Sequence, residues 1–365
     1  MRRLRQAFGA CGVALALLGA CGPIESRAAD APLVIRDQGA RPFGGTRAGD
    51  PAKASISCDH GYVEWQVPRN ARKYPLLMVH ASSTKTWDTT FDGREGFRNI
   101  FLRRGYGVYL TDLPRTGRAG QACVSTTYEP RVNNDQASLT AWRIGIWLPG
   151  KAAPDFYPGV QFPVRNQRAL DEFFRIQYPE FNAPENEQIE TDALAQLLNE
   201  VGRSVVLTHS STGIRGWITG TKTANIAAIV SYEPGNAVFP EGEVPPPIRR
   251  VDGMMVPAGE VIPMADFMKL TKLPIQIVWG DYIPVRSDPV NIGPRLTLDA
   301  RRVNVERAKL MVAAINRHGG QATNIMLPEM GITGNTHFPM MDLNNVRIAD
   351  LLSSFLAEHK LDARR

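Results

Sequence analysis

The sequence predicts an α/β protein with a mostly parallel central sheet that is covered by helices on both faces. Short apolar runs alternate with stretches of helical spacing along most of the 365 residues, a pattern typical of parallel sheets. In addition, one apolar run leads straight into a serine-containing turn and then into a helical stretch. The length is sufficient for one large domain of this class.

The first predicted elements follow one another in the order strand, strand, helix, strand. Alternation at residues 62–67 predicts a half-buried strand, and the apolar run at 76–79 predicts a buried strand that ends at His80. A helix is expected over 91–104 and another buried strand over 107–111. The same reasoning, applied to the second half of the chain, predicts strands over 204–208, 226–230, 275–279 and 324–327, and helices over 190–201, 301–317 and 345–358.

The pattern also divides the chain into segments. Residues 1–29 read as a leader, and residues 30–59, rich in Gly, Pro and Arg with weak periodicity, predict a loosely packed N-terminal arm. The main domain is then expected over 60–365. Within it the alternation of strands and helices lapses over about 121–184 and again over about 236–270, so we expect lid insertions there.

The leader predicts export from a bacterial cell. Three arginines near the start precede an apolar run at 13–18 and then small residues before Cys21. Leu18-Gly19-Ala20-Cys21 resembles a lipobox, so that Cys21 would carry a lipid anchor; the competing reading is ordinary cleavage near Ala28-Ala29, after which the protein is periplasmic or secreted. No later apolar run is long enough to span a bilayer.

Charge and cysteine content narrow the function classes. The formal net charge is +6, but the basic residues are spread along the chain without a stripe of stacking aromatics, which argues against nucleic-acid binding. Cys58 and Cys123 are the two cysteines beyond the leader. In an oxidising compartment they could form a disulfide, and two separate buried thiols are an equally open reading. The oligomeric state is not predicted.

Ser210 is the candidate nucleophile. The strand that ends at Thr208-His209 enters a turn and a helix, an arrangement that lifts a serine hydroxyl clear of the sheet and points backbone N–H groups at it. Small residues usually flank such a serine in a G-x-S-x-G pattern. Here Thr208 and Thr212 occupy the glycine positions, and the glycine is displaced to Gly213. A serine- and threonine-rich helix cap is the alternative reading of this segment.

A serine hydroxyl needs a base and a group that orients the base. His337 is the best candidate base, because it lies in a Gly/Asn loop between the last strand and the closing helix. Glu233, at the end of the strand after the serine, is the chosen acid, with Asp281 and Asp288 as fallbacks. The chain order nucleophile, acid, base holds for each of these carboxylates.

An oxyanion hole needs two donors. We expect the backbone N–H groups of Ser211, which follows the nucleophile, and of Ser82, in the loop after the 76–79 strand, to supply them. His80 in the same loop is expected to hold the loop in place by side-chain hydrogen bonds.

These residues resemble the α/β-hydrolase superfamily, and within it a group of bacterial esterases whose acid is a glutamate after the sixth strand. The motifs that carry the resemblance are His80-Ala81-Ser82-Ser83, Thr86-Trp87-Asp88-Thr89-Thr90, Phe101-Leu102-Arg103-Arg104-Gly105-Tyr106, Gln161-Phe162-Pro163-Val164, His209-Ser210-Ser211, Val230-Ser231-Tyr232-Glu233-Pro234-Gly235, Trp279-Gly280-Asp281-Tyr282-Ile283 and Gly334-Asn335-Thr336-His337. The resemblance covers about residue 60 to the end.

The resemblance implies hydrolysis of carboxylic esters by Ser210, His337 and Glu233. Two departures concern the substrate pocket: Ser82-Ser83 stands where the family has adjacent cysteines, and the segment 237–270 is longer. Substrate preference is therefore not implied. The expected partner is a small-molecule ester, with no metal or organic cofactor. An amidase or lactonase, and a non-catalytic envelope lipoprotein that binds ligands, remain the alternatives.

Overall fold

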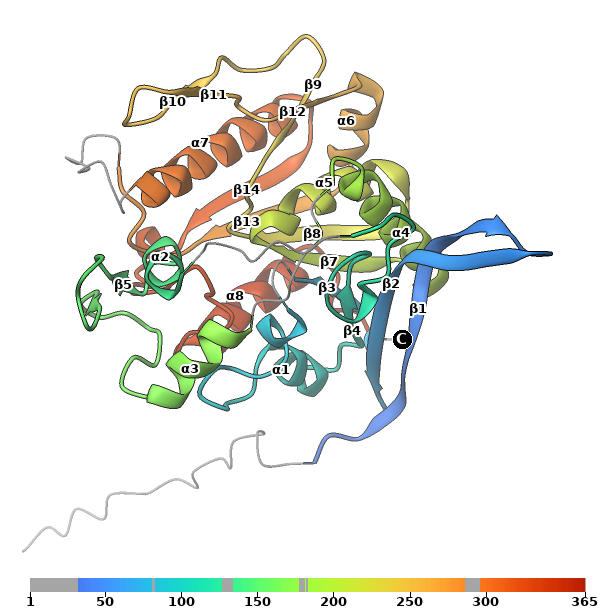
Figure 1. Ribbon diagram of the computed structural model, residues 1–365, viewed down its shortest axis with the longest axis horizontal. Coiled ribbons are helices and arrows are strands. Elements are labelled where there is room, and N and C mark those ends of the chain that lie inside the picture. Colours follow the sequence, from blue (N-terminus) through green and yellow to red (C-terminus); the bar gives the residue numbers. More distant parts are fainter. Residues whose placement is uncertain are drawn as a thin grey trace, which may run out of the picture. The chain divides into compact units, whose positions relative to one another are not determined.

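The computed structural model describes residues 32–80, 83–126, 134–176, 181, 183–285 and 296–364 (Figure 1). Leu33–Arg365 is one compact unit. Its centre is an eight-stranded sheet. In spatial order the strands are β1 (Ile35–Asp50), β2 (Ala54–Pro68), β4 (Val108–Asp112), β3 (Leu76–Val79), β7 (Ser204–His209), β8 (Ile226–Tyr232), β13 (Pro274–Trp279) and β14 (Gln321–Met326).

The six strands from β4 to β14 pair in parallel, and β1 and β2 pair antiparallel at one edge. The helices are α1 (Phe97–Arg103), α2 (Asp135–Ala141), α3 (Gln167–Arg175), α4 (Asn186–Val201), α5 (Gly213–Lys222), α6 (Met264–Leu270), α7 (Leu296–Arg317) and α8 (Asn345–Glu358). This confirms the predicted class, a mostly parallel sheet with helices packed against it.

Alternation along the strands creates two hydrophobic cores. In β3, Leu76 and Met78 face the core that includes α1, α3 and α8, whereas Leu77 and Val79 face the core that includes α4, α5, α6 and α7. Figure 1 shows these two groups of helices on opposite sides of the sheet. Because both faces are covered, the inner parallel strands β3, β7, β8 and β13 are largely apolar and were recognisable in the sequence as continuous runs, whereas the edge strand β14 is more polar.

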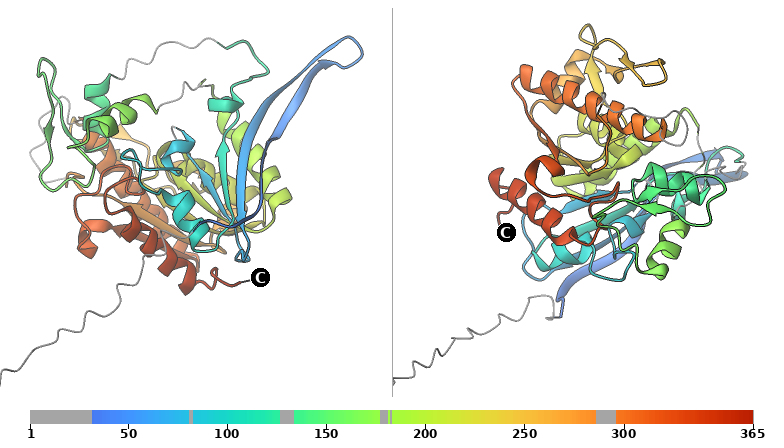
Figure 2. Two further views of the ribbon diagram at one scale, coloured as in Figure 1. Left: turned by 90° about the horizontal axis from the view of Figure 1, so that it is seen from below. Right: turned by 90° about the vertical axis from the view of Figure 1, so that its left-hand side faces the viewer.

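The prediction of a loosely packed arm over 30–59 is wrong for the residues that the structure describes there. β1 and β2 form a long antiparallel hairpin whose pairs run from Ile35↔Pro68 to Asp50↔Ala54. Only Tyr62–Gln66 of β2 also pairs with β4, so the far end of the hairpin projects from the sheet (Figure 2). Strands that are largely exposed on both faces need no apolar alternation, which is why this segment lacked a strand signal.

The hairpin is tied to the main domain by a disulfide. Cys58 in β2 is bonded to Cys123, with their Cα atoms 5.0 Å apart. The structure therefore settles the open question of these two cysteines in favour of pairing. Cys21 and the rest of the expected leader lie outside the described residues.

Both segments expected as insertions lie outside the eight-stranded sheet. Between β4 and α4, the described residues form α2, α3 and the short pair β5 (Gly145–Ile146) and β6 (Asp155–Phe156). The second segment contains α6 and four short strands, namely β9 (Val238–Pro240), β10 (Ile248–Arg249), β11 (Met255–Val256) and β12 (Glu260–Ile262). In the part of the chain that the structure describes, no helix has the length and apolar character needed to cross a membrane.

Most predicted elements are present, with shifted ends. α1 begins at Phe97, six residues later than expected, because Phe91 and Gly93 belong to a turn closed by a Thr89↔Glu95 bridge. α7 begins at Leu296, earlier than the 301 expected from periodicity.

Candidate active site

The structure brings Ser210, Glu233 and His337 together at the carboxyl ends of neighbouring parallel strands. Ser210 follows β7 directly, and Glu233 follows β8, which pairs with β7. His337 lies in the loop between β14 and α8. Side chains at adjacent carboxyl ends of a parallel sheet meet at one edge, which is where ligand sites of open α/β sheets occur.

Ser210 is held in a strained turn. Its φ is +55°, in the left-handed region that a residue with a side chain rarely adopts, and a single 3₁₀ turn, Ser210–Thr212, joins β7 to α5. Ser210 is half-buried rather than enclosed. Such a turn is characteristic of a serine presented above a sheet.

The two threonines that depart from the usual glycine pattern have satisfied hydroxyls. Thr208 Oγ1 donates to Ser231 Oγ at 2.7 Å. Thr212 Oγ1 donates to His209 O at 2.8 Å and accepts from the backbone N–H of His209 at 3.1 Å. Threonine is therefore compatible with the turn, because each buried hydroxyl has partners.

The displaced glycine serves close packing at the start of α5. A Cβ added to Gly213 would lie 2.4 Å from Pro234 Cβ, the residue that follows Glu233. The backbone N–H of Gly235 also donates to Ser210 O at 2.9 Å. These contacts bind the turn after β7 to the turn after β8, so Gly213 fixes the spacing of Ser210 and Glu233.

His337 is buried and joins the other two residues. Its Nε2 lies 2.9 Å from Ser210 Oγ, and its Nδ1 lies 2.5 Å from Glu233 Oε2. Its backbone is held on both sides: His337 N donates to Trp142 O at 3.0 Å, and His209 Nε2 donates to His337 O at 2.8 Å. The imidazole is thus oriented between a hydroxyl and a carboxylate.

Glu233 is completely buried, with φ of +51°. Its Oε1 accepts from the N–H of Gly280 at 2.7 Å and from the guanidinium of Arg143, while Oε2 faces His337. Burial alone would raise the pKa of Glu233, but the positive charge of Arg143 and the contacts with His337 outweigh it and hold this pKa well below its ordinary value. The carboxyl group is ionised at neutral pH.

The histidines of the site are neutral. Burial, together with the nearby charge of Arg301, lowers the pKa of His337 well below 6.5, although Glu233 opposes the shift. Burial lowers the pKa of His209 to about 4. His337 is therefore unprotonated in the resting state and its Nε2 is free to take a proton from Ser210.

Asp281, the fallback acid that the structure describes, contacts backbone N–H groups instead of His337. Both carboxylate oxygens of Asp281 accept backbone N–H groups, Oδ1 from Tyr282 at 2.7 Å and Oδ2 from Gly334 at 2.8 Å. Asp281 thereby shapes the loop that carries the histidine. Asp288 lies outside the described residues.

Two buried residues of this region were missed in the sequence analysis. Arg143 contacts Glu233 from the first insertion, about ninety positions away in the chain. Asp342 accepts from Thr336 N at 2.7 Å and from Asn335 Nδ2 at 3.0 Å and so fixes the turn before His337. Burial raises the pKa of Asp342 to about 7. The position of Asp342 shortly after the candidate base was its one available clue.

Of the two candidate oxyanion donors, Ser211 is among the residues that the structure describes. Ser211 lies at the start of the turn into α5, where the backbone N–H groups of a helix N-terminus are unpaired. Ser82 lies outside the described residues. At the start of its loop His80 Nε2 is 2.7 Å from Asp112 Oδ1, and Arg118 also pairs with Asp112.

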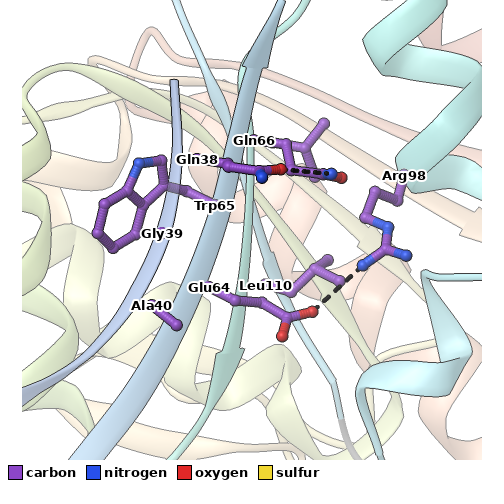
Figure 3. Close-up of a pocket in the computed structure, with 9 residues that line it drawn as sticks. Gln38, Gly39, Ala40, Glu64, Trp65, Gln66, Arg98 and Leu110 are labelled. Carbon is purple, nitrogen blue, oxygen red and sulfur yellow. Dashed lines mark hydrogen bonds and ion pairs between the residues drawn. The ribbon is translucent and has the colours of Figure 1, made fainter. Parts of the chain in front are cut away.

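A separate pocket of about 430 Å³ lies on the sheet near its β1 edge (Figure 3). Its lining residues come from β1, β2, β4 and α1, and include Trp65 and the Glu64–Arg98 pair, whose shortest N–O distance is 3.3 Å. None of the candidate site residues that the structure describes lines this pocket. Among the described residues, no group of three or more His, Cys, Asp and Glu side chains is arranged to hold a metal ion.

The chain as a whole is similar to other proteins. The chain superposes on the atomic-resolution structure of a novel bacterial esterase with a TM-score of 0.70 and 26% identity, over 90% of this chain and 98% of the other. It is 27% identical over 317 residues to a probable secreted lipase, phiG, from a fungal species (strain ATCC 74256), covering 81% of this chain and 85% of the relative. No protein-family model matches the chain.

Proposed function

We propose that this chain, which has the α/β-hydrolase fold, is a serine carboxylesterase with Ser210 as nucleophile, His337 as base and Glu233 as acid. One observation carries the proposal: a continuous line of contacts runs from Glu233 Oε2 through both ring nitrogens of His337 to Ser210 Oγ. The acid and the base have the protonation states that the reaction requires, since the Glu233 carboxylate is ionised and the His337 imidazole is neutral.

The reaction proceeds in two acyl transfers. Ser210 Oγ attacks the ester carbonyl carbon while His337 Nε2 takes the hydroxyl proton. The tetrahedral intermediate collapses, the C–O bond to the alcohol breaks, and the imidazolium returns its proton to the departing alkoxide. Water then attacks the acyl-enzyme by the same proton transfers and releases the carboxylic acid. Throughout, Glu233 holds Nδ1–H and stabilises the positive charge on the ring.

The negative charge that develops on the carbonyl oxygen also needs donors. In this proposal they are the backbone N–H groups of Ser211 and Ser82. The hydrogen bond between His80 and Asp112 anchors the beginning of the Ser82 loop. Burial alone would raise the pKa of Asp112, but contacts with His80 and Arg118 keep it below its ordinary value, so the Asp112 carboxylate remains ionised.

The comparisons favour an ester substrate over an amide or a lactone. Both similar proteins are named as ester hydrolases, one an esterase and one a lipase. The lipase is described as secreted, and the disulfide between Cys58 and Cys123 is suited to an oxidising compartment. We therefore infer that the protein is exported and acts on a small-molecule ester in the periplasm, at the cell envelope or outside the cell.

The test is labelling with a fluorophosphonate, which reacts with activated serines, together with turnover of short-chain p-nitrophenyl esters. The wild type and the Ser354→Ala variant should react with the fluorophosphonate and hydrolyse the ester equally. Ser354→Ala removes an exposed hydroxyl on α8. Ser210→Ala should do neither while it keeps the wild-type melting temperature. A folded wild-type protein that neither labels nor hydrolyses any ester would overturn the proposal in favour of a binding module. Parallel assays with an amide and a lactone identify the preferred bond.

A further inference from the structure

Arg143 is not a member of the proposed triad, yet it is one of the largest fully buried side chains among the described residues. It follows the C-terminus of α2 in the first insertion. Its φ is +62°, and its backbone N–H donates to Thr140 O at 3.1 Å, so the chain reverses direction there and the side chain turns inward. Its guanidinium then donates to Glu233 Oε1 through Nη2 and to Asp281 O through Nε at 2.6 Å.

The neighbouring residue of the same turn holds the base. Trp142 O accepts the backbone N–H of His337 at 3.0 Å. Two consecutive residues after α2 therefore contact two members of the proposed triad, one through a carbonyl and one through a guanidinium. The main sheet provides the strand ends, but contacts from the insertion complete the arrangement of Glu233 and His337.

Glu233 depends on Arg143 for its charge. Apart from His337, the donors to this carboxylate among the described residues are the Arg143 guanidinium and the single N–H of Gly280. Other charged or titratable groups face Glu233 as well: Arg301 from α7, His209 from the end of β7, and Asp342 from the histidine loop. Arg143 alone among the cations makes an ion pair with it in the described part of the chain.

The burial of Arg143 is costly, which points to a role beyond stability. Its Nη1 is buried without a hydrogen-bond partner among the described residues. An unsatisfied buried donor destabilises the fold, and apolar side chains of similar volume often replace buried ion pairs without loss of stability. A hydrophobic residue at this position would pack as well but would leave Glu233 without its arginine ion-pair partner.

We infer that Arg143 is a positioning residue of the esterase, whose guanidinium keeps Glu233 ionised and aimed at His337 Nδ1 and thereby makes triad assembly depend on the first insertion. The inference rests on the proposed function for its kinetic consequences. The Glu233–His337 hydrogen bond can depend on Arg143 whether or not the protein hydrolyses an ester.

The experiment compares Arg143→Met and Arg143→Lys with Arg168→Met, which removes a highly exposed arginine of α3 in the same insertion. Two quantities are measured for each folded variant: kcat and KM for a p-nitrophenyl ester across pH, and the proton NMR resonance of His337 Nδ1–H, which a hydrogen bond to a carboxylate shifts far downfield. Melting temperatures report the folded state.

In Arg143→Met, kcat should fall on the order of 10- to 100-fold, the range typical when a group that orients a site residue is removed, with KM nearly unchanged. The acid limb of kcat should move to higher pH, because Glu233 must now lose a proton, and the downfield resonance should disappear. Arg143→Lys keeps the charge but not the planar fork, so it should retain the wild-type acid limb with a reduced kcat. Arg168→Met should match the wild type in every measurement.

A purely structural role predicts a different result. A lower melting temperature in Arg143→Met, with the acid limb and the downfield resonance both unchanged, would overturn the inference. If the wild type hydrolyses no ester, the proposed function fails, yet loss of the resonance in Arg143→Met alone still supports the positioning role.

Discussion

His337 Nδ1 lies 2.5 Å from Glu233 Oε2, and both residues are completely shielded from solvent. A carboxylate at this distance fixes the tautomer of the ring, because Nδ1 must carry the proton that it donates. Nε2 is then left as the acceptor that faces Ser210 at 2.9 Å. The direction of proton transfer in the proposed reaction thus follows from one hydrogen bond on the far side of the ring.

Glu233→Gln removes the negative charge while preserving the volume of the side chain. We expect kcat for a p-nitrophenyl ester to fall on the order of 10³- to 10⁴-fold, because the amide neither enforces this tautomer nor stabilises the imidazolium. Steady-state kinetics measure the loss. Glu243→Gln, which alters a carboxylate paired with Arg317 and His318, should leave kcat unchanged. Equal kinetics in Glu233→Gln and the wild type would exclude Glu233 as the acid.

The pH dependence of kcat/KM reports the pKa of the free base. Burial and the charge of Arg301 lower the pKa of His337 below 6.5, so the base stays neutral, and the enzyme active, at pH values where an exposed histidine is largely protonated. The acid limb should therefore have its midpoint below pH 6.5.

A substitution of Arg301 tests whether its charge lowers the pKa of His337. Burial lowers its own pKa to about 10, and its Nε lies 3.5 Å from Ala141 O, beside the turn that holds His337. Arg301→Met removes a positive charge that disfavours the imidazolium, so the acid limb should move to higher pH. Arg317→Met, at the opposite end of α7, should not move it. A downward shift in Arg301→Met would contradict this electrostatic account.

The meeting of Ser210 and Glu233 was predictable because it depends on local signals. Each follows a continuous apolar run, and parallel strands covered on both faces give such runs and place their carboxyl ends at one edge. His337 was predictable from a similar argument about the loop before the last helix. The order of the strands thus brings the Ser210 and Glu233 positions together.

Neither Arg143 nor the β1–β2 hairpin could be predicted from the sequence, and the reason is the same for both. Neither is encoded in a local pattern: Arg143 acts through a contact across the fold, and the hairpin is held by backbone pairing between largely exposed strands. An arginine in an irregular segment reads as a solvated charge, and strands exposed on both faces read as a loop. Tertiary contacts determine both features.

The disulfide between Cys58 and Cys123 should contribute stability without affecting turnover, because neither cysteine contacts the candidate site. It closes a loop with a sequence separation of 65 residues. Its loss should lower the free energy of unfolding by about 2–4 kcal/mol. Urea unfolding of the wild type with and without a reductant measures this. The double variant Cys58→Ser/Cys123→Ser should match the reduced wild type and show no response to reductant; a wild type that is insensitive to reductant would contradict the pairing.

Gly213→Ala tests whether α5 sets the spacing between nucleophile and acid. Alanine favours a helix over glycine by about 1 kcal/mol, so propensity alone predicts stabilisation. At this position, however, the new Cβ would lie 2.4 Å from Pro234 Cβ and 3.0 Å from its Cα, and a proline ring beside a strained backbone has little room to move. We expect a net loss of about 1–3 kcal/mol from overpacking, together with a reduced kcat as Ser210 and Glu233 are pushed apart.

Gly220→Ala is the matched control in the same helix. There the nearest atom to a new Cβ is Leu270 Cδ2 at 2.7 Å, the tip of a side chain that can change its rotamer. Its stability should change by less than that of Gly213→Ala, and its kcat should stay at the wild-type value because the contact lies at the far end of α5 from Ser210. If both variants lost stability equally and kept full kcat, Gly213 would be an ordinary helix residue, and the spacing of the site would have to come from the strands alone.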